Sequence, residues 1–125
     1  GELSAPALNL AASQRLSQHA LVVLLSSLEA VSHDQALTDV LAMIAHKHTL
    51  IFASAINPQI EQMSHERDNA DLAYQAAAAE RTLLETNQAR SQLKRLGIEV
   101  VESAPATLAP ALADTYLALK AAGRL

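Results

Sequence analysis

Three stretches of the chain are almost wholly apolar and short enough to be buried strands. They cover residues 19–26, 49–55 and 98–101. Unbroken apolarity over such a short run is typical of a strand covered on both faces, as in a parallel sheet between helices. Polar residues follow each run and predict a turn at the end of each strand.

Apolar residues recur at helical spacing between the first two runs. A stripe that includes Leu37, Val40, Leu41 and Ile44 predicts a helix that ends near residues 46–47, where basic side chains suit a helix C-terminus. The order S-H-D-Q over residues 32–35 matches a capping box. We therefore expect Ser32 to cap this helix and Gln35 to reach back to it.

The longest expected helix covers residues 68–96 and stops at Gly97, a residue suited to the left-handed end of a helix. A helix of roughly 40 Å is longer than a compact domain of this size, so we expect it to kink or to project. Its apolar residues predict an inner face made of Leu72, Ala76, Ala79, Leu83, Leu93 and Leu96. Its polar residues predict a solvated outer face, which becomes a docking surface if the helix projects: Arg81, Glu85, Gln88, Gln92 and Arg95.

Further helices are expected over residues 4–17, 59–63 and 108–122, the last ended by Gly123. The last helix should turn five residues inward: Leu108, Ala111, Leu112, Tyr116 and Leu119. Strands that alternate with helices require right-handed crossovers and a parallel sheet. We therefore expect one α/β domain or domain fragment over residues 1–125, with a three-stranded parallel sheet flanked by helices and an N-terminal helix before residue 19.

The first strand of this sheet would have a partner along one edge only. Exposed strand edges pair readily with other chains. We therefore expect either a homodimer formed through this strand edge or coverage of the edge by the N-terminal segment.

The composition narrows the range of functions. The 125 residues carry a net charge of −4, with three aromatic side chains and no cysteine. The absence of cysteine excludes disulfides, thiol catalysis and thiolate metal sites, and the acidic, aromatic-poor composition disfavours nucleic acid as a partner. No apolar run approaches the roughly 20 residues that span a bilayer, and the start of the chain lacks the pattern of a secretory signal. We expect a cytoplasmic segment without membrane insertion and, because the chain begins at Gly1 rather than Met, a piece of a longer protein.

Small polar residues follow each expected strand. Ser26, Ser27 and Glu29 follow the first, Asn57 follows the second and Ser103 follows the third. Open α/β sheets place their sites at the carboxyl ends of the strands, so these residues are candidates for a ligand-binding or partner-binding rim. Turn and helix-cap chemistry also favours these residue types, and we regard it as the better explanation.

Catalytic and metal-binding signatures are weak. Ser26 and Ser27 lack the glycines of a G-x-S-x-G elbow, and phosphate-binding glycine motifs are absent, so we expect no enzyme. His46 and His48 lie two residues apart at an expected helix end, where a structural role is more common than zinc binding without further ligands.

Most of the chain resembles a known bacterial family. Residues 74–125 (YQAAAAERTLLETNQARSQLKRLGIEVVESAPATLAPALADTYLALKAAGRL) are similar to the C-terminal end of the domain-of-unknown-function fifty-eight family. Members show an alanine-rich YRRAAAERLL helix, an RRxGVxVVDAPP strand and turn, and a closing LAxALAxRYLELKARGRL helix. LVVLLSSLE resembles the LVVLLTDLE strand of the family and INPQIEQM its RDPELxxL turn, so the similarity covers nearly all of residues 19–125.

The resemblance implies the second half of a von Willebrand factor A-like, Rossmann-type domain. A complete family domain begins with a D-x-S-x-S loop that helps to hold a divalent metal. This chain has no such loop, and Ser27 and Asn57 stand where the family has aspartates. Hard cations prefer several oxygen ligands, anionic ones above all, so we expect no metal here.

Family members often occur beside MoxR-type AAA+ ATPases. The resemblance therefore implies a non-catalytic protein-interaction module that partners such an ATPase system, on a membrane-tethered parent protein. The alternative from another class is a small ligand-binding or enzymatic domain that uses the rim of Ser26, Ser27 and Glu29.

Overall fold

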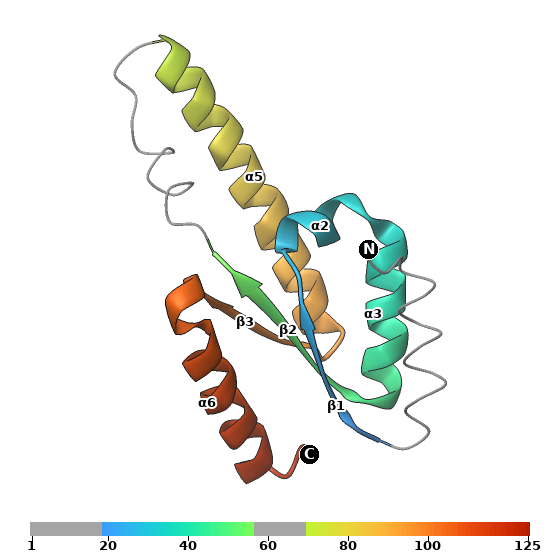
Figure 1. Cartoon of the computed structure of the whole chain (residues 1–125). Helices are drawn as coiled ribbons and strands as arrows, with labels where there is room; N and C mark the ends of the chain where they lie inside the picture. The colour runs from blue at the N-terminus through green and yellow to red at the C-terminus, as the bar shows by residue number, and fades with distance from the viewer. Residues whose placement is uncertain (1–18, 57–69) are drawn as a thin grey trace, which may run out of the picture.

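The computed structural model describes residues 19–56 and 70–125, and the helices expected over residues 4–17 and 59–63 lie outside these ranges. The fold is α/β, with a three-stranded parallel sheet in the order β1-β2-β3 flanked by helices, as predicted (Figure 1). Along the chain the elements are β1 (Leu21–Leu25), α2 (Leu28–His33), α3 (Gln35–Lys47), β2 (Thr49–Ala55), α5 (Ala70–Arg95), β3 (Glu99–Ser103), the 3-10 turn η1 (Pro105–Thr107) and α6 (Leu108–Ala121).

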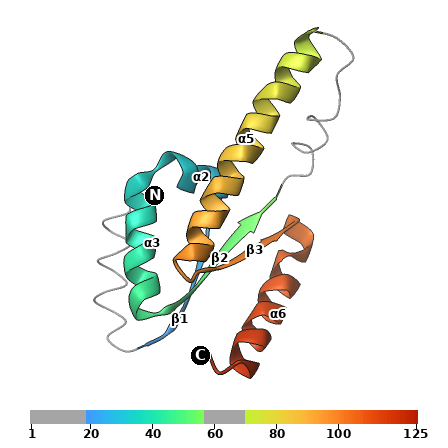
Figure 2. The same ribbon diagram turned by 180° about the vertical axis from the view of Figure 1, so that it is seen from behind.

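Alternate side chains of the strands build two separate apolar layers. Leu50 and Phe52 are fully buried on the face that packs against α2, α3 and α5. Ile51 and Val101 lie on the opposite face, against α6. Figures 1 and 2 show α2, α3 and α5 on one side of the sheet and α6 on the other.

The face beneath α6 is only partly covered. This helix packs against β3 and β2. Leu21 at the start of β1 still reaches the apolar layer beneath α6. Two later β1 side chains on that face do not: Val23 is 47% exposed and Leu25 is 66% exposed. The sheet therefore presents apolar surface along its β1 side.

The backbone of β1 is paired along one edge. The Ser26 amide donates to the Ala53 carbonyl, and the Thr49 amide donates to the Ala20 carbonyl, each at 3.0 Å. In a parallel pair the N–H and C=O groups of one residue face the same neighbour, and successive residues alternate in direction. The even-numbered residues of β1 thus face β2, and the odd-numbered ones point their backbone groups away from it. Among the described residues, no strand pairs with that outer edge.

Asp34 caps α3, so the predicted capping box of Ser32 and Gln35 is wrong. The Asp34 carboxylate accepts a hydrogen bond from the Leu37 amide at 3.1 Å. The reason is α2, an unpredicted helix that runs through His33 and places Ser32 inside a helical turn. Ser32 therefore donates its hydroxyl to the Glu29 carbonyl at 2.7 Å instead.

The long helix α5 ends as predicted and extends past the sheet (Figures 1 and 2). Gly97 has a φ of +83°, the left-handed conformation that glycine adopts without strain. Ala76, Ala79 and Leu93 are buried, in agreement with the predicted inner face. Leu96 is 38% exposed and does not belong to that face, because it follows the last helical residue, where the chain turns toward β3.

One inward position predicted for α6 is also wrong. Leu108, Ala111, Leu112 and Leu119 pack over the sheet, but Tyr116 is 40% exposed. At 3.6 residues per turn, position 116 lies to the side of the line that joins positions 108 and 119. The half-buried Thr115 lies on that line instead.

We predict that Asp34→Ala lowers the free energy of unfolding by about 0.5–2 kcal/mol, because it removes the side-chain cap of α3. Ser32→Ala serves as the control and should change stability by less than about 0.5 kcal/mol, since its hydroxyl bonds only within α2. Urea denaturation followed by circular dichroism measures both. A larger loss for Ser32→Ala would mean that the capping box forms after all.

Candidate functional site

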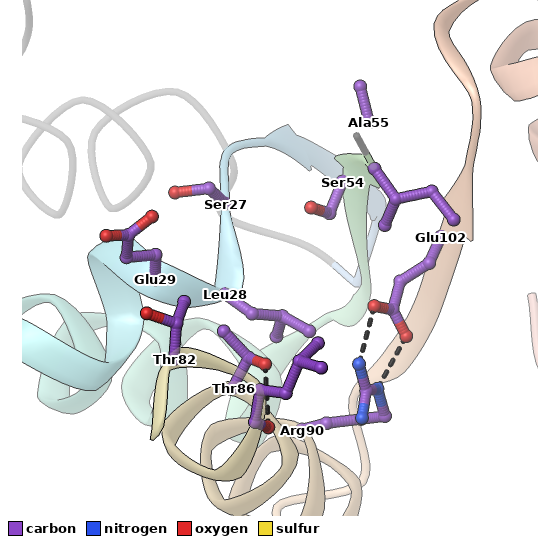
Figure 3. A pocket seen from close by; sticks show the side chains of 11 residues that line it. Ser27, Leu28, Glu29, Ser54, Ala55, Thr82, Thr86, Arg90 and Glu102 are labelled. Carbon is purple, nitrogen blue, oxygen red and sulfur yellow. Dashed lines mark hydrogen bonds and ion pairs between the residues drawn. The ribbon is translucent and has the colours of Figure 1, made fainter. Parts of the chain in front are cut away.

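A cavity of about 420 Å³ opens at the carboxyl ends of the strands. Ser27 and Glu29 reach it from the start of α2, Ser54 reaches it from β2, and Thr82 and Thr86 from α5 (Figure 3). Ligand pockets commonly have volumes of about 300–1,000 Å³, and in α/β sheets they lie at this end of the strands. The cavity is therefore the candidate functional site in the part of the chain described.

An ion pair forms one wall of the cavity. Arg90 of α5 donates from Nε to Glu102 Oε2 at 2.5 Å and from a terminal nitrogen to Glu102 Oε1 at 2.7 Å. It also donates to the Asn87 side-chain oxygen. The hydrogen bonds with Glu102 raise the pKa of Arg90, against the opposing effect of burial, and the negative charge of Glu102 adds to the rise. The pair links α5 to β3 and holds two opposite charges at the cavity with no net charge between them.

Two of the five predicted rim residues line this cavity. Ser27 and Glu29 do, whereas Ser26 and Ser103 are half-buried and are not part of the lining. Ser103 lies on the α6 side of the sheet, where its hydroxyl bonds to Thr107. Asn57 lies outside the described residues.

Ser27 also has a structural role. Its backbone is extended, and its hydroxyl accepts a hydrogen bond from the Ala30 amide at 3.1 Å, which makes it the N-cap of α2. Ser27 thus begins a helix in this protein. The cap accounts for the choice of serine without a ligand.

The two neighbouring histidines have different environments. His46 is exposed in the last turn of α3. His48 is 7% exposed, and its Nδ1 accepts a hydrogen bond from the Ala20 amide at 3.1 Å. The pairing of a ring nitrogen with backbone gives His48 a structural role at the junction of α3 and β2.

The predicted outer face of α5 is not uniformly solvated. Arg81, Gln88 and Arg95 are exposed, whereas Gln92 is half-buried. Glu85 is also half-buried, and its carboxylate lies 3.3 Å from the His33 ring nitrogen of α2. Glu85 and Gln92 are therefore only partly solvated, and for Glu85 the reason is that α2 packs against this part of α5.

Sequence reasoning missed the polar residues that α5, β2 and β3 bring to the cavity. Ser54 interrupts the apolar run of β2, and Glu102 is a charge within a strand, so each carried a signal. No sequence signal indicates the pairing of Arg90 with Glu102, because the pair depends on how α5 crosses β3.

In residues 19–56 and 70–125 no group of three or more histidine, aspartate or glutamate residues is placed to hold a metal ion. Over the same residues, no helix combines the length and apolarity that a membrane crossing requires.

Comparison with known proteins adds no relative. No protein-family model, curated protein or solved structure matches the chain. The resemblance to the domain-of-unknown-function fifty-eight family therefore stays a prediction that rests on the sequence motifs.

We predict that Glu102→Gln lowers the free energy of unfolding by about 1.5–3 kcal/mol, because Arg90 loses charged hydrogen bonds in a half-buried site. Glu99→Gln is the matched control on the same strand. Glu99 pairs with Arg124 at 2.5 Å, but both side chains are more exposed, so its loss should cost less than about 1 kcal/mol. Chemical denaturation of both variants tests this, and equal losses would contradict it.

Proposed function

We propose that this chain is a non-catalytic protein-interaction module that binds a protein strand along the open edge of β1. The observation that supports the proposal is the combination of outward-facing backbone groups with the exposed apolar side chains of Val23 and Leu25 on the same strand. An added strand would satisfy the backbone groups and cover the side chains. Strand addition of this kind is a common mode of protein recognition.

The two edge strands differ in their protection. β3 carries Glu99 and Glu102, and charged side chains discourage pairing along a sheet edge. β1 has the sequence LVVLL, without a charge or a proline. Of the two edges of the sheet, β1 is therefore the one suited to pairing.

A second copy of this chain is the first occupant that we propose. An antiparallel pair centred on Val23 would bond Val23 to its own equivalent and Leu21 to the equivalent of Leu25. The outward groups of all three residues would then be paired. The exposed side chains of both copies would join into one apolar face between the two α6 helices.

The wider setting of the module rests on the family resemblance. We propose a MoxR-type AAA+ ATPase system as the partner, with the exposed α5 residues Arg81, Gln88 and Arg95 as a docking face. All three side chains belong to α5, the helix that extends past the sheet (Figure 2).

Ser27, the candidate nucleophile, already has a structural role, and this supports a non-catalytic function. Ser27 caps α2, and no histidine is among the described residues that line the cavity. A serine nucleophile needs a base within hydrogen-bond reach. The cavity residues therefore favour binding over acyl transfer.

We predict that the wild-type chain sediments as a dimer at equilibrium and that Val23→Pro sediments as a monomer. Proline removes the outward amide at the centre of the proposed pair but breaks no hydrogen bond to β2. Circular dichroism should show that the variant keeps the wild-type fold.

Val23→Thr is the matched control, because it keeps both the amide and the branched shape that suits a strand. It should remain a dimer, although a weaker one. A wild-type chain that is monomeric at all concentrations, or a Val23→Pro variant that is as dimeric as wild type, would contradict pairing through β1.

A further inference from the structure

The cavity at the strand ends has an unusual balance of hydrogen-bonding groups. Thr82 donates its hydroxyl to the Ala78 carbonyl at 3.2 Å, and Thr86 donates to the Leu83 carbonyl at 3.0 Å. A hydroxyl has one proton to donate, so once that proton is in a hydrogen bond the oxygen can only accept from a further partner. Both threonines can therefore offer only oxygen lone pairs to a molecule in the cavity.

The charged groups of the cavity also favour a ligand that donates hydrogen bonds. The Glu29 carboxylate is exposed at the mouth of the cavity, and among the described residues it takes part in none of the ion pairs. Arg90 is already bonded to Glu102 and Asn87, so its charge is compensated. Among the described lining residues, the charges of Glu29, Glu102 and Arg90 sum to −1, which favours a cation and disfavours an anion.

The hydroxyl of Ser54 faces the cavity. Ser54 is 4% exposed, yet its side chain is part of the lining and points toward Ser27 in Figure 3. None of the hydrogen bonds seen among the described residues uses this hydroxyl. No buried side-chain oxygen or nitrogen atom among the described residues lacks a partner, so the Ser54 hydroxyl is open to the cavity, where a donor can bond to it.

The rest of the lining is apolar. Leu28 and Leu83 contribute from α2 and α5, and Ala55 and Ile56 contribute from the end of β2. An apolar wall beside an acceptor-rich one suits a molecule with a charged donor head and a short hydrocarbon chain.

We propose that this cavity binds the ammonium group of a small alkyl amine, with its chain against Leu28 and Leu83. The ammonium group donates to oxygen atoms of the lining, with the Glu29 carboxylate as its charged partner. The proposal depends on the cavity alone and is independent of pairing through β1. The same group occurs on free amines and on the lysine side chain of a protein, and either source fits this chemistry.

The test titrates the intact chain with n-butylammonium, with butan-1-ol and with butyrate, while two-dimensional NMR follows the backbone amides. The three probes share a four-carbon chain and differ in the charge of the head group. We expect saturable shifts at Ser54 and Thr86 with n-butylammonium only. Equal binding of butan-1-ol or butyrate, or no saturable binding of n-butylammonium, would overturn the proposal.

Two variants test the role of the carboxylate. Glu29→Gln should weaken n-butylammonium binding by up to about fivefold, because the charge of an exposed carboxylate is lost. Asp114→Asn removes an exposed carboxylate from α6, on the other side of the sheet, and should leave binding unchanged. Equal affinities of Glu29→Gln and wild type would overturn the proposal.

A capped lysine, Nα-acetyl-lysine N-methylamide, separates the two sources. Binding as tight as that of n-butylammonium would identify a lysine side chain as an acceptable ligand. Binding of n-butylammonium without binding of the capped lysine would restrict the site to free amines. Both results support recognition of the ammonium group.

Discussion

The burial of β2 on both faces and along both edges is the constraint on which the other elements depend. Five of its seven residues are buried, and its backbone pairs with β1 on one side and β3 on the other. The β2 residue Phe52 is fully buried against the helical layer, where Leu41 of α3 and Leu93 of α5 are also fully buried. Removal of any neighbour would expose apolar surface at about 25 cal/mol per Å², so the strand order and the helix positions stabilise one another.

The sequence predicts best those elements whose pattern is local. The run TLIFASA predicts β2 at its observed bounds, and Gly97 predicts the end of α5. The third strand begins one residue later than predicted and extends to Ser103, because pairing with Ala55 continues the ladder through polar residues. Helix α2 was missed because six residues are too few to show a helical period. That omission also produced the wrong capping assignment, since Ser32 is a poor cap once it lies within a helix.

The candidate site was less predictable than the fold. Position along the sequence places Ser27 and Glu29 at a strand end, and the structure puts both on the cavity. Ser103 also follows from that logic, but the alternation of side chains along β3 turns it to the α6 face. Arg90, Thr82 and Thr86 reach the cavity only because α5 crosses the strand ends, and that crossing is a property of packing.

The two proposals use different parts of the same sheet. Strand pairing uses the outer edge of β1, which lacks the charges that β3 carries, and amine binding uses the carboxyl ends of the strands. Ser27 connects them in sequence, since it follows β1 by two residues and caps α2. A partner strand on β1 would therefore lie within a few residues of the cavity mouth.

The central claim is that the outer edge of β1 is open in the isolated chain and is filled on association. Amide hydrogen exchange of β1, measured by NMR over a range of protein concentrations, tests this most directly. We predict that Val22 and Leu24, which face β2, are protected throughout, while Val23 and Leu25 exchange fast in dilute solution and slowly at high concentration. Protection of Val23 and Leu25 at the lowest concentration, or fast exchange at the highest, would contradict the claim.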